Sequence, residues 1–168
     1  LLHICGLIVL DPSTVPGGYD YVSLRNELEA RLTAVPQFRM KLADSRFNLD
    51  HPVWVDDHDF DLDRHVHHVG VPAPGGRTEL AELCGHIAAQ PLDRSRPLWE
   101  MYLVEGLSKN RVAIFTKSHS SLVDGESAPE IGQVILDVDR AGRDVPEELW
   151  MPRPQPSEAT LIAAALGE

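Results

Sequence analysis

The most constraining feature of this sequence is the junction between a wholly apolar run and a polar stretch. Residues 112–115 read V-A-I-F, apolar at consecutive positions, which predicts a strand that is buried on both faces. Residues 118–125 read S-H-S-S-L-V-D-G and carry a histidine and an Asp-Gly pair where that strand ends. An amphipathic helical pattern follows over residues 126–138. The junction therefore places polar side chains at the mouth of a sheet, where ligands and catalysis are commonly found.

Strand-like and helix-like patterns alternate along the rest of the chain. Apolar runs predict four further strands: 3–10, which reads as buried, 38–42, 52–55 and 101–104. Residues at helical spacing predict two further helices: one with Leu24, Leu28, Leu32 and Val35 on its apolar face, and one with Leu80, Leu83, Cys84 and Ile87. Thr78 is the candidate N-cap of the second helix. Residues 101–104 and 111–117 flank a short turn, G-L-S-K-N, and predict a hairpin.

Length and charge limit the classes of protein to which the chain can belong. Its 168 residues suffice for one domain with a substantial core. The net charge is -11, from 15 Lys and Arg against 26 Asp and Glu. This balance argues against nucleic acid as a main partner and against simple electrostatic attraction to an anionic membrane. No apolar run approaches the roughly 20 residues that a transmembrane helix needs. The chain begins at Leu1 in the middle of an apolar pattern, so we expect a piece of a longer protein.

Two cysteines, Cys5 and Cys84, lie within apolar patterns. We interpret them as two buried free thiols in a reducing compartment. A disulfide is the alternative, although two cysteines alone do not make a disulfide framework.

An acidic, histidine-rich segment over residues 56–69 reads D-D-H-D-F-D-L-D-R-H-V-H-H-V and raises the question of a metal site. In an extended segment His65 and His67 would point to one side and His68 to the other. Two histidines on one face with nearby aspartates suit a divalent ion. The segment lacks a tight ligand spacing such as C-x-x-C or H-E-x-x-H, so we favour a solvated edge strand without a metal. Its expected inward positions are Phe60, Leu62 and Val66, with His68 as a further candidate.

The composition changes near residue 140, which predicts a domain boundary between residues 1–139 and residues 140–168. Residues 143–156 contain four prolines and Trp150, as expected of an extended linker. An apolar, helix-like run over residues 160–166 follows the linker.

A second motif, taken together with the junction, resembles one family of enzymes. Residues 91–100 read P-L-D-R-S-R-P-L-W-E, similar to that family's P-L-D-x-x-x-P-L-W motif. Residues 119–125, H-S-S-L-V-D-G, stand a short way downstream, as the family's H-H-x-x-x-D-G motif does. The segments F-D-L-D-R-H-V-H-H-V and W-M-P-R-P-Q-P-S resemble the family at the corresponding places. The chain is thus similar to the bacterial wax ester synthase/diacylglycerol acyltransferase family over nearly its whole length. We expect Leu98 and Trp99 of the first motif to pack in the core.

The resemblance implies a fold. It is α/β, the N-terminal half of the CoA-dependent acyltransferase fold found in chloramphenicol acetyltransferase-like proteins and condensation domains, with a mixed sheet flanked by helices. Residues 1–139 would be the N-terminal acyltransferase domain. Residues 140–168 would be the linker and the start of a crossover to a C-terminal domain, which forms the other wall of the active-site tunnel.

The resemblance also implies a reaction and its partners. A fatty acyl group passes from acyl-CoA to diacylglycerol or a long-chain alcohol, without a metal or cofactor. The implied partners are these substrates and the C-terminal half of the same protein. The implied location is cytoplasmic, with a peripheral place at the inner membrane or at lipid bodies as an extension. The alternatives are a degenerate homologue that binds lipid or acyl-CoA, and an acyltransferase that uses a carrier-protein-bound acyl group.

Carried over residue by residue, the active-site motif matches at three positions and departs at one. The candidate catalytic residues are His119, Ser120 and Asp124, and Gly125 is the candidate substrate-binding residue. Ser120 stands where the family has its second His, the residue to which the base role is assigned. The resemblance implies that Asp124 shapes the loop and that Gly125 leaves room for the acyl donor.

Three interpretations of Ser120 follow. An alcohol is a poor nucleophile at neutral pH, so the reaction needs a base, for which His is the usual residue. In the first interpretation His119 is the base in a shifted geometry, and in the second Ser120 is a nucleophile that His119 activates. In the third the site is catalytically weak or dead, and the protein binds lipid or acyl-CoA or has only a regulatory role. Adjacent strand residues point to opposite faces, which opposes the first two interpretations unless the chain turns here.

Overall fold

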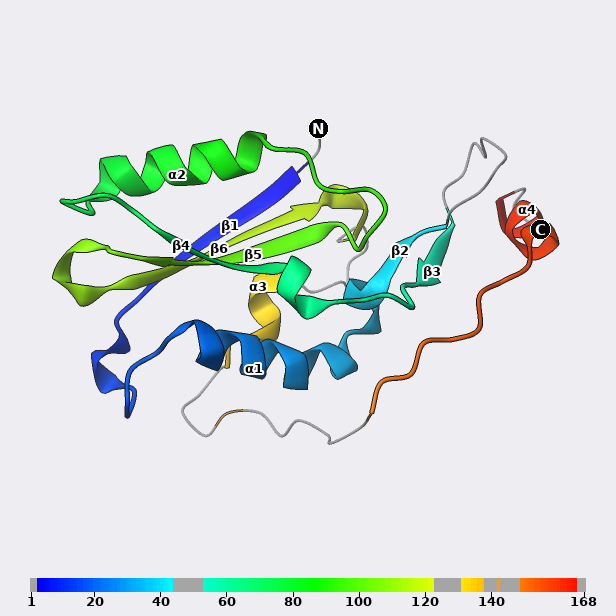
Figure 1. The fold of residues 1–168 in the computed structure, drawn as a ribbon, viewed down its shortest axis with the longest axis horizontal. Coiled ribbons are helices and arrows are strands. Elements are labelled where there is room, and N and C mark those ends of the chain that lie inside the picture. Colours follow the sequence, from blue (N-terminus) through cyan, green and yellow to red (C-terminus); the bar gives the residue numbers. More distant parts are fainter. Residues whose placement is uncertain (1–2, 44–52, 123–130, 138–141, 143–148, 166–168) are drawn as a thin grey trace.

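The structure is a computed structural model that describes residues 3–43, 53–122, 131–137, 142 and 149–165. A four-stranded sheet with the order β1-β6-β5-β4 forms its body (Figure 1). The strands are β1 (His3–Leu10), β4 (Val66–Gly70), β5 (Trp99–Glu105) and β6 (Val112–His119). β6 is antiparallel to both β1 and β5, whereas β4 is parallel to β5. The sheet is therefore mixed, and the predicted hairpin of β5 and β6 is confirmed.

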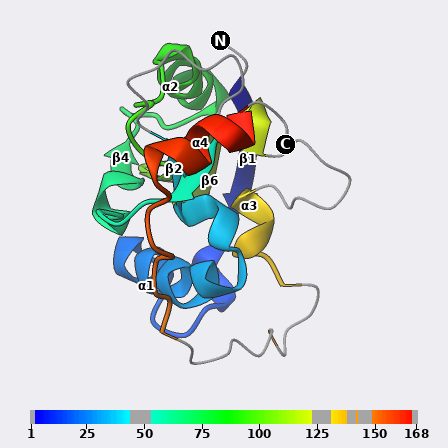
Figure 2. The same cartoon turned by 90° about the vertical axis from the view of Figure 1, so that its right-hand side faces the viewer.

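Helices cover both faces of this sheet. α2 (Arg77–Ala89) lies on one face, and α1 (Tyr21–Arg31) with the short α3 (Ile131–Val134) lies on the other (Figure 1). After a 90° turn the sheet is seen between α2 and α1 (Figure 2). The side chains of Leu24, Leu28 and Leu32 are fully buried in the core, as their helical spacing predicts. The α/β class with a mixed sheet between helices is confirmed.

The two faces of β6 supply the centre of two separate clusters of apolar side chains. Val112 and Ile114 join the α1 side, and Ala113 and Phe115 join the α2 side. All residues from Val112 to Ser118 are buried, as the run of consecutive apolar residues predicts. This double burial fixes the direction of the side chains at the end of the strand.

The prediction that residues 3–10 form a buried strand is wrong in one respect. β1 has the predicted bounds, but within the described structure it pairs with β6 alone and is an edge strand. Ile4, Leu7 and Val9 are therefore 38%, 45% and 45% exposed. Cys5 on the same strand is exposed, so the expected burial of this thiol is also wrong. Neither cysteine forms a disulfide in the described structure, which agrees with their interpretation as thiols.

The predicted N-cap of α2 is also wrong. Gly76, with extended backbone, precedes the helix, and its N–H donates to Oε2 of Glu79 at 2.7 Å. The Glu79 carboxylate thus reaches back over the first turn, as in a capping box, and Thr78 lies inside the helix. Among the described helices, none is long and apolar enough to cross a bilayer.

A smaller unit lies beside the sheet. β2 (Met40–Leu42) and β3 (Trp54–Asp56) form an antiparallel pair, close to the two short strands predicted there. The segment after residue 149 runs in an extended form to α4 (Glu158–Ala165). Arg153 in this segment donates to the buried carboxylate of Asp56 from its backbone N–H, at 2.7 Å, and from its guanidinium, at 2.8 Å. The division between residues 1–139 and 140–168 stays a prediction.

Candidate active site

His119 is the last residue of β6, and the chain turns directly after it. Ser120–Leu122 form one turn of 3-10 helix. The strand runs two residues beyond the predicted range of 111–117, because Ser118 and His119 still pair with β1. The polar stretch therefore begins inside the sheet and leaves it at His119.

The two sequence motifs meet at this end of the sheet. The N–H of His119 donates to the carbonyl oxygen of Leu98 at 2.9 Å. Trp99 is fully buried, and its indole N–H donates to the Phe38 carbonyl at 2.7 Å. The expected packing of Leu98 and Trp99 in the core is confirmed. The P-L-D-R-S-R-P-L-W segment thus holds the backbone of the candidate catalytic histidine.

Ser121 occupies one ring nitrogen of His119. Its backbone N–H lies 3.2 Å and its Oγ 2.7 Å from Nδ1 of His119. A backbone amide can only donate, so Nδ1 is the acceptor and the neutral ring carries its proton on Nε2. The Ser121 hydroxyl then also donates to Nδ1. A hydroxyl and an unprotonated imidazole nitrogen at this distance form the pair from which nucleophiles and proton relays are built.

Cationic neighbours and burial favour the neutral form of His119. Its pKa is lowered, first by partial burial of the ring and then by electrostatic interaction with the Arg94 guanidinium and the His3 ring. His3 lies directly opposite His119 in the β1–β6 register, and its Nδ1 lies 3.2 Å from the Ala88 carbonyl. A neutral imidazole at neutral pH is the form that can accept a proton.

The remaining predicted site residues lie around this pair or outside the described residues. The half-buried Ser120 side chain makes no hydrogen bond within the part of the chain that is described, so the hydroxyl beside His119 is that of Ser121. Oγ of Ser118 is buried and also has no partner among the described residues. Asp124 and Gly125 lie outside the described residues, as does most of the predicted helix over 126–138, of which α3 is the described part.

A buried lysine lies two residues before His119 and was not singled out from the sequence. Lys117 is 1% exposed, and its Nζ donates to the carbonyl oxygens of Ile87 and Gln90 at 2.9 and 3.0 Å. The ammonium also lies 3.2 Å from Oε2 of Glu100, which accepts from the Tyr102 hydroxyl at 2.8 Å. Positive charge at the last carbonyls of α2 is favourable. The only signal in the sequence was a lysine on a strand predicted to be buried on both faces.

The histidine-rich segment does not gather ligands for a metal. His65 is buried, stacks on Trp99 at 4.8 Å, and lies 2.8 Å through Nδ1 from the Trp99 carbonyl. The His67 ring lies 4.8 Å from that of Tyr102 in a tilted arrangement, on the α2 side of the sheet. The expectation that His65 and His67 share a side is wrong, because a 3-10 turn over Leu62–Arg64 precedes β4 and the strand begins after His65. Among the described residues no group of three or more His, Cys, Asp or Glu is placed to hold a metal ion.

The edge position and the inward residues of that segment agree with the prediction. β4 is the edge strand of the sheet on the side opposite to β1. Leu62 and Val66 are buried, and Phe60 packs against the same core cluster. His68 is 45% exposed in its side chain, stacks on Tyr21 and pairs with Glu105 at 2.8 Å, so it is not an inward position.

Comparisons with known proteins give one consistent result. The family model of the wax ester synthase/diacylglycerol acyltransferase catalytic domain matches residues 1–167. The probable diacylglycerol O-acyltransferase tgs3 of Mycobacterium tuberculosis is 46% identical over 151 residues, which are 90% of this chain and 56% of that protein. The solved wax ester synthase/diacylglycerol acyltransferase from Marinobacter aquaeolei VT8 is 34% identical with a TM-score of 0.58, and the match covers 76% of this chain and 31% of that one.

A more distant structure shares the fold alone. The starter condensation domain of the rhizomide synthetase RzmA has a TM-score of 0.58 at 14% identity, over 79% of this chain and 31% of that one. The chain spans 56% of the length of tgs3 and 31% of the solved Marinobacter protein.

Proposed function

The chain belongs to the wax ester synthase/diacylglycerol acyltransferase family, and we propose that the complete protein is an O-acyltransferase that reacts at the His119 end of β6. The observation that carries this proposal is the family match over residues 1–167 together with a histidine at the mouth of the sheet whose pKa is lowered and whose Nδ1 accepts from Ser121. The Leu98 carbonyl, from the second shared motif, holds the backbone of that histidine.

The proposed donor is acyl-CoA and the proposed acceptor is diacylglycerol or a long-chain alcohol. A thioester is already activated, so the proposed transfer uses no metal and no cofactor. The C-terminal half of the same protein is proposed to complete the site. The proposed location is cytoplasmic, with a peripheral place at the inner membrane or at lipid bodies.

His119 is proposed to act as the base through Ser121. Because Nδ1 already accepts from Ser121, an acceptor alcohol does not reach Nδ1 directly. The alcohol instead passes its proton to Oγ of Ser121 as the Ser121 proton moves to Nδ1. Among the described residues the Nε2–H group has no acceptor, and we propose that it donates to a carbonyl oxygen that gains negative charge. Ser120 has no part in this relay, and Asp124 and Gly125 keep the loop-shaping and donor-binding roles that the family motif implies.

A second function, lipid or acyl-CoA binding without turnover, is favoured by one observation. The residue at the position of the family's second His is Ser120, whose hydroxyl is not a useful base at neutral pH. A site of this kind would keep the binding surface and lose the proton acceptor. A third candidate is an acyltransferase whose donor is an acyl group bound to a carrier protein in place of acyl-CoA, and the test below includes this donor.

The test is an ester-formation assay on the complete protein, with acyl-CoA and either diacylglycerol or hexadecanol. We expect wild-type turnover, a loss of about 10²–10⁴-fold in His119→Ala, and a smaller loss in Ser121→Ala that falls on kcat rather than on KM. His86→Ala is the matched control, because His86 is an exposed histidine on α2 that bonds only to Gln90.

Each outcome selects one function. Full activity in His119→Ala would exclude His119 as the base. Acyl-CoA binding by calorimetry, with no ester from either wild type or Ser120→His, would select the binding role. Transfer from an acyl-carrier protein but not from acyl-CoA would change the donor. If none of these substrates binds or reacts, the acyltransferase proposal fails.

A further inference from the structure

A pocket lies at the opposite end of the sheet from His119. It has a volume of about 450 Å³ and is lined by the end of β1, the loop before α2, the first turns of α2, and the turn between β5 and β6. β6 starts at this end with Val112 and carries His119 at its other end, seven residues away. At about 3.3 Å per residue the pocket is more than 20 Å along the strand from the candidate active site.

Three cationic side chains line this pocket and form no ion pair among the described residues, although the charge of Arg111 contributes to the lowered pKa of the exposed Asp11 carboxyl. Arg77, Lys109 and Arg111 make no ion pair in the part of the chain that is described. Seven other described cations do, and they are Arg25, Arg31, Lys41, Arg64, Arg96, Lys117 and Arg153. In a chain of net charge -11, unpaired cations that line one pocket are a local reversal of sign.

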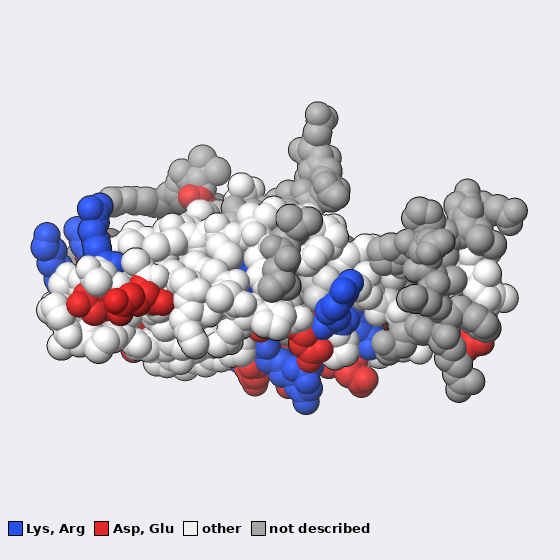
Figure 3. Space-filling view, turned by 90° about the horizontal axis from the view of Figure 1, so that it is seen from above, with Lys and Arg blue, Asp and Glu red and all other residues white. Residues whose placement is uncertain are grey.

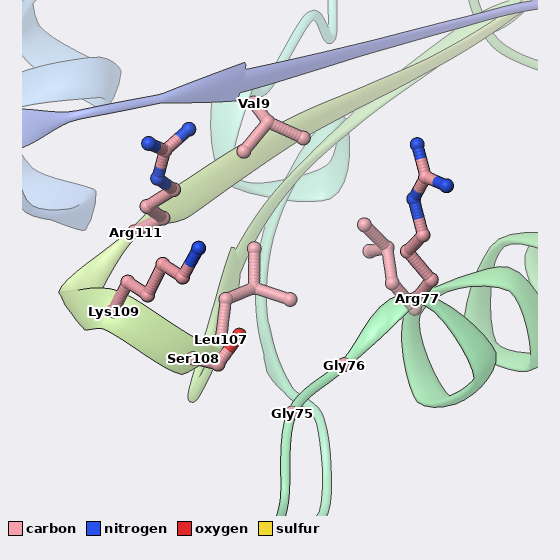
Figure 4. Close-up of a pocket in the computed structure, with 9 residues that line it drawn as sticks. Val9, Gly75, Gly76, Arg77, Leu107, Ser108, Lys109 and Arg111 are labelled. Atoms are coloured by element: carbon pink, nitrogen blue, oxygen red, sulfur yellow. The ribbon is translucent and has the colours of Figure 1, made fainter.

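The figures show the same arrangement. Lys and Arg side chains stand at one end of the visible face, beside a strip of acidic side chains, and a second group of basic and acidic side chains lies along its lower edge (Figure 3). In the close-up, Lys109 and Arg111 rise from one side of the pocket and Arg77 from the other, with Val9 and Leu107 between them (Figure 4). The nearest acidic group in the first turn of α2, Glu79, is already held by the Gly76 N–H.

The frame of the pocket is held by close contact between two loops. A Cβ on Gly75 would lie 2.1 Å from the Gly106 carbonyl oxygen, so the two backbones touch where only glycine fits. The Ser108 N–H donates to the Gly75 carbonyl at 2.9 Å. Lys109 itself has a left-handed backbone, with φ of 60°. The loop that carries Lys109 and the loop that leads to Arg77 are thereby fixed to each other.

We propose that Arg77, Lys109 and Arg111 form a binding site for the phosphate group of a phosphate ester. Guanidinium groups match phosphate oxygens in geometry, and a lysine adds a point charge. Val9, Leu80 and Leu107 give the pocket an apolar floor, and Val9 is 45% exposed. The ligand therefore combines a phosphate ester with a less polar part. A phospholipid, with its acyl chains, and a purine nucleotide, with its base, share this chemistry, and the experiment separates them.

The test measures binding to the complete protein and to a charge variant of the pocket. The probes are ADP, followed by calorimetry, and phosphatidylcholine vesicles with or without phosphatidylglycerol, followed by sedimentation. We expect one probe to bind at least tenfold more weakly to Arg77→Gln/Arg111→Gln than to wild type, and to bind more weakly as salt is raised. The control is Arg25→Gln/Arg64→Gln, which changes the net charge equally but lies outside the pocket.

Every outcome decides the proposal. Loss of vesicle binding in the pocket variant alone identifies a lipid headgroup, and loss of ADP binding alone identifies a soluble phosphate ester. Arg77→Lys/Arg111→Lys keeps the charge and should bind within a few-fold of wild type, which separates a charge effect from misfolding. Binding of both probes that is equal in the pocket variant and the control, or no binding by wild type, overturns the proposal.

Discussion

At the scale of single residues, the electrostatic surroundings of His119 lead to a prediction that does not depend on turnover. Arg94 is one of the charges that lower the pKa of this histidine, after burial. Replacing it in Arg94→Gln removes a cation, so the pKa of His119 should rise. If His119 is the base, the acid side of the pH–rate profile should move to higher pH, because the unprotonated form is then lost earlier on acidification.

The measurement is an NMR titration of the His119 ring in wild type and in Arg94→Gln. Arg64→Gln serves as the control, since Arg64 pairs with Asp61 at the 3-10 turn before β4 and not with His119. A pKa of His119 that stays constant or falls in Arg94→Gln would contradict the account given for its surroundings.

Sequence reasoning found His119 but not its partner. A histidine at the end of a doubly buried run was visible in the pattern, and the P-L-W motif next to it was visible as well. The partner was not visible in the pattern. The alternation of side chains along a strand applies only up to His119, and the 3-10 turn that follows brings the Ser121 side chain to the His119 ring. The pairing of Ser121 with Nδ1 is thus a property of the turn. A turn of this kind depends on backbone angles that the pattern of apolar residues does not encode.

At the scale of secondary-structure elements, Lys117 fastens α2 to the sheet. Its ammonium is buried from solvent, donates to the Ile87 and Gln90 carbonyls at the helix end and pairs with Glu100 of β5. Lys117→Met keeps the length of the side chain and leaves these groups without their cation. We expect the free energy of unfolding to fall by about 2–4 kcal/mol, measured by denaturant unfolding.

Two further variants make that measurement specific. Lys109→Met changes an exposed lysine on the β5–β6 turn and should alter the stability by less than about 0.5 kcal/mol. Adding Glu100→Gln to Lys117→Met removes the unpaired carboxylate and should restore part of the loss. A Lys117→Met protein as stable as wild type would show that the helix end does not depend on this ammonium.

The elements themselves were largely predictable, and the failures share a cause. The periods of the apolar residues gave α1, α2 and the β5–β6 hairpin, because those elements bury one face or both in the same core. For β1 the pattern gave the bounds but not the exposure. The apolar character of a strand does not say how many neighbours it has, which depends on the order of strands in the sheet. The pattern also did not encode the 3-10 turn before β4, which places His65 and His67 on different sides.

At the scale of the whole molecule, the C-terminal extended segment is held back against the body of the structure. Arg39 lies between the rings of Phe60 and Trp150, at 4.9 and 4.6 Å from their centroids. Nearby, the Arg153 guanidinium and backbone N–H both bond Asp56, and Nε2 of His58 lies 2.8 Å from the Arg153 carbonyl. These contacts hold the extended, proline-rich segment in one position. The segment has the composition of a linker but packs against the rest of the structure.

This attachment should depend on the charge of Asp56. The Arg153 guanidinium lowers the pKa of the Asp56 carboxyl in the folded state. The ion pair therefore contributes its full stability above the pKa of 3.8 that the carboxyl has in the unfolded chain, and this contribution is lost as the pH falls through the lower pKa of the folded state. Asp56→Asn removes the charge at every pH. We therefore expect chymotrypsin to cut the complete protein near Trp150 on the order of tenfold faster in Asp56→Asn than in wild type at neutral pH, because the segment opens more often. Asp61→Asn, which alters a carboxylate that caps a turn on the surface, should leave the rate unchanged. Equal rates in Asp56→Asn and wild type would mean that the aromatic contacts around Arg39 hold the segment without the ion pair.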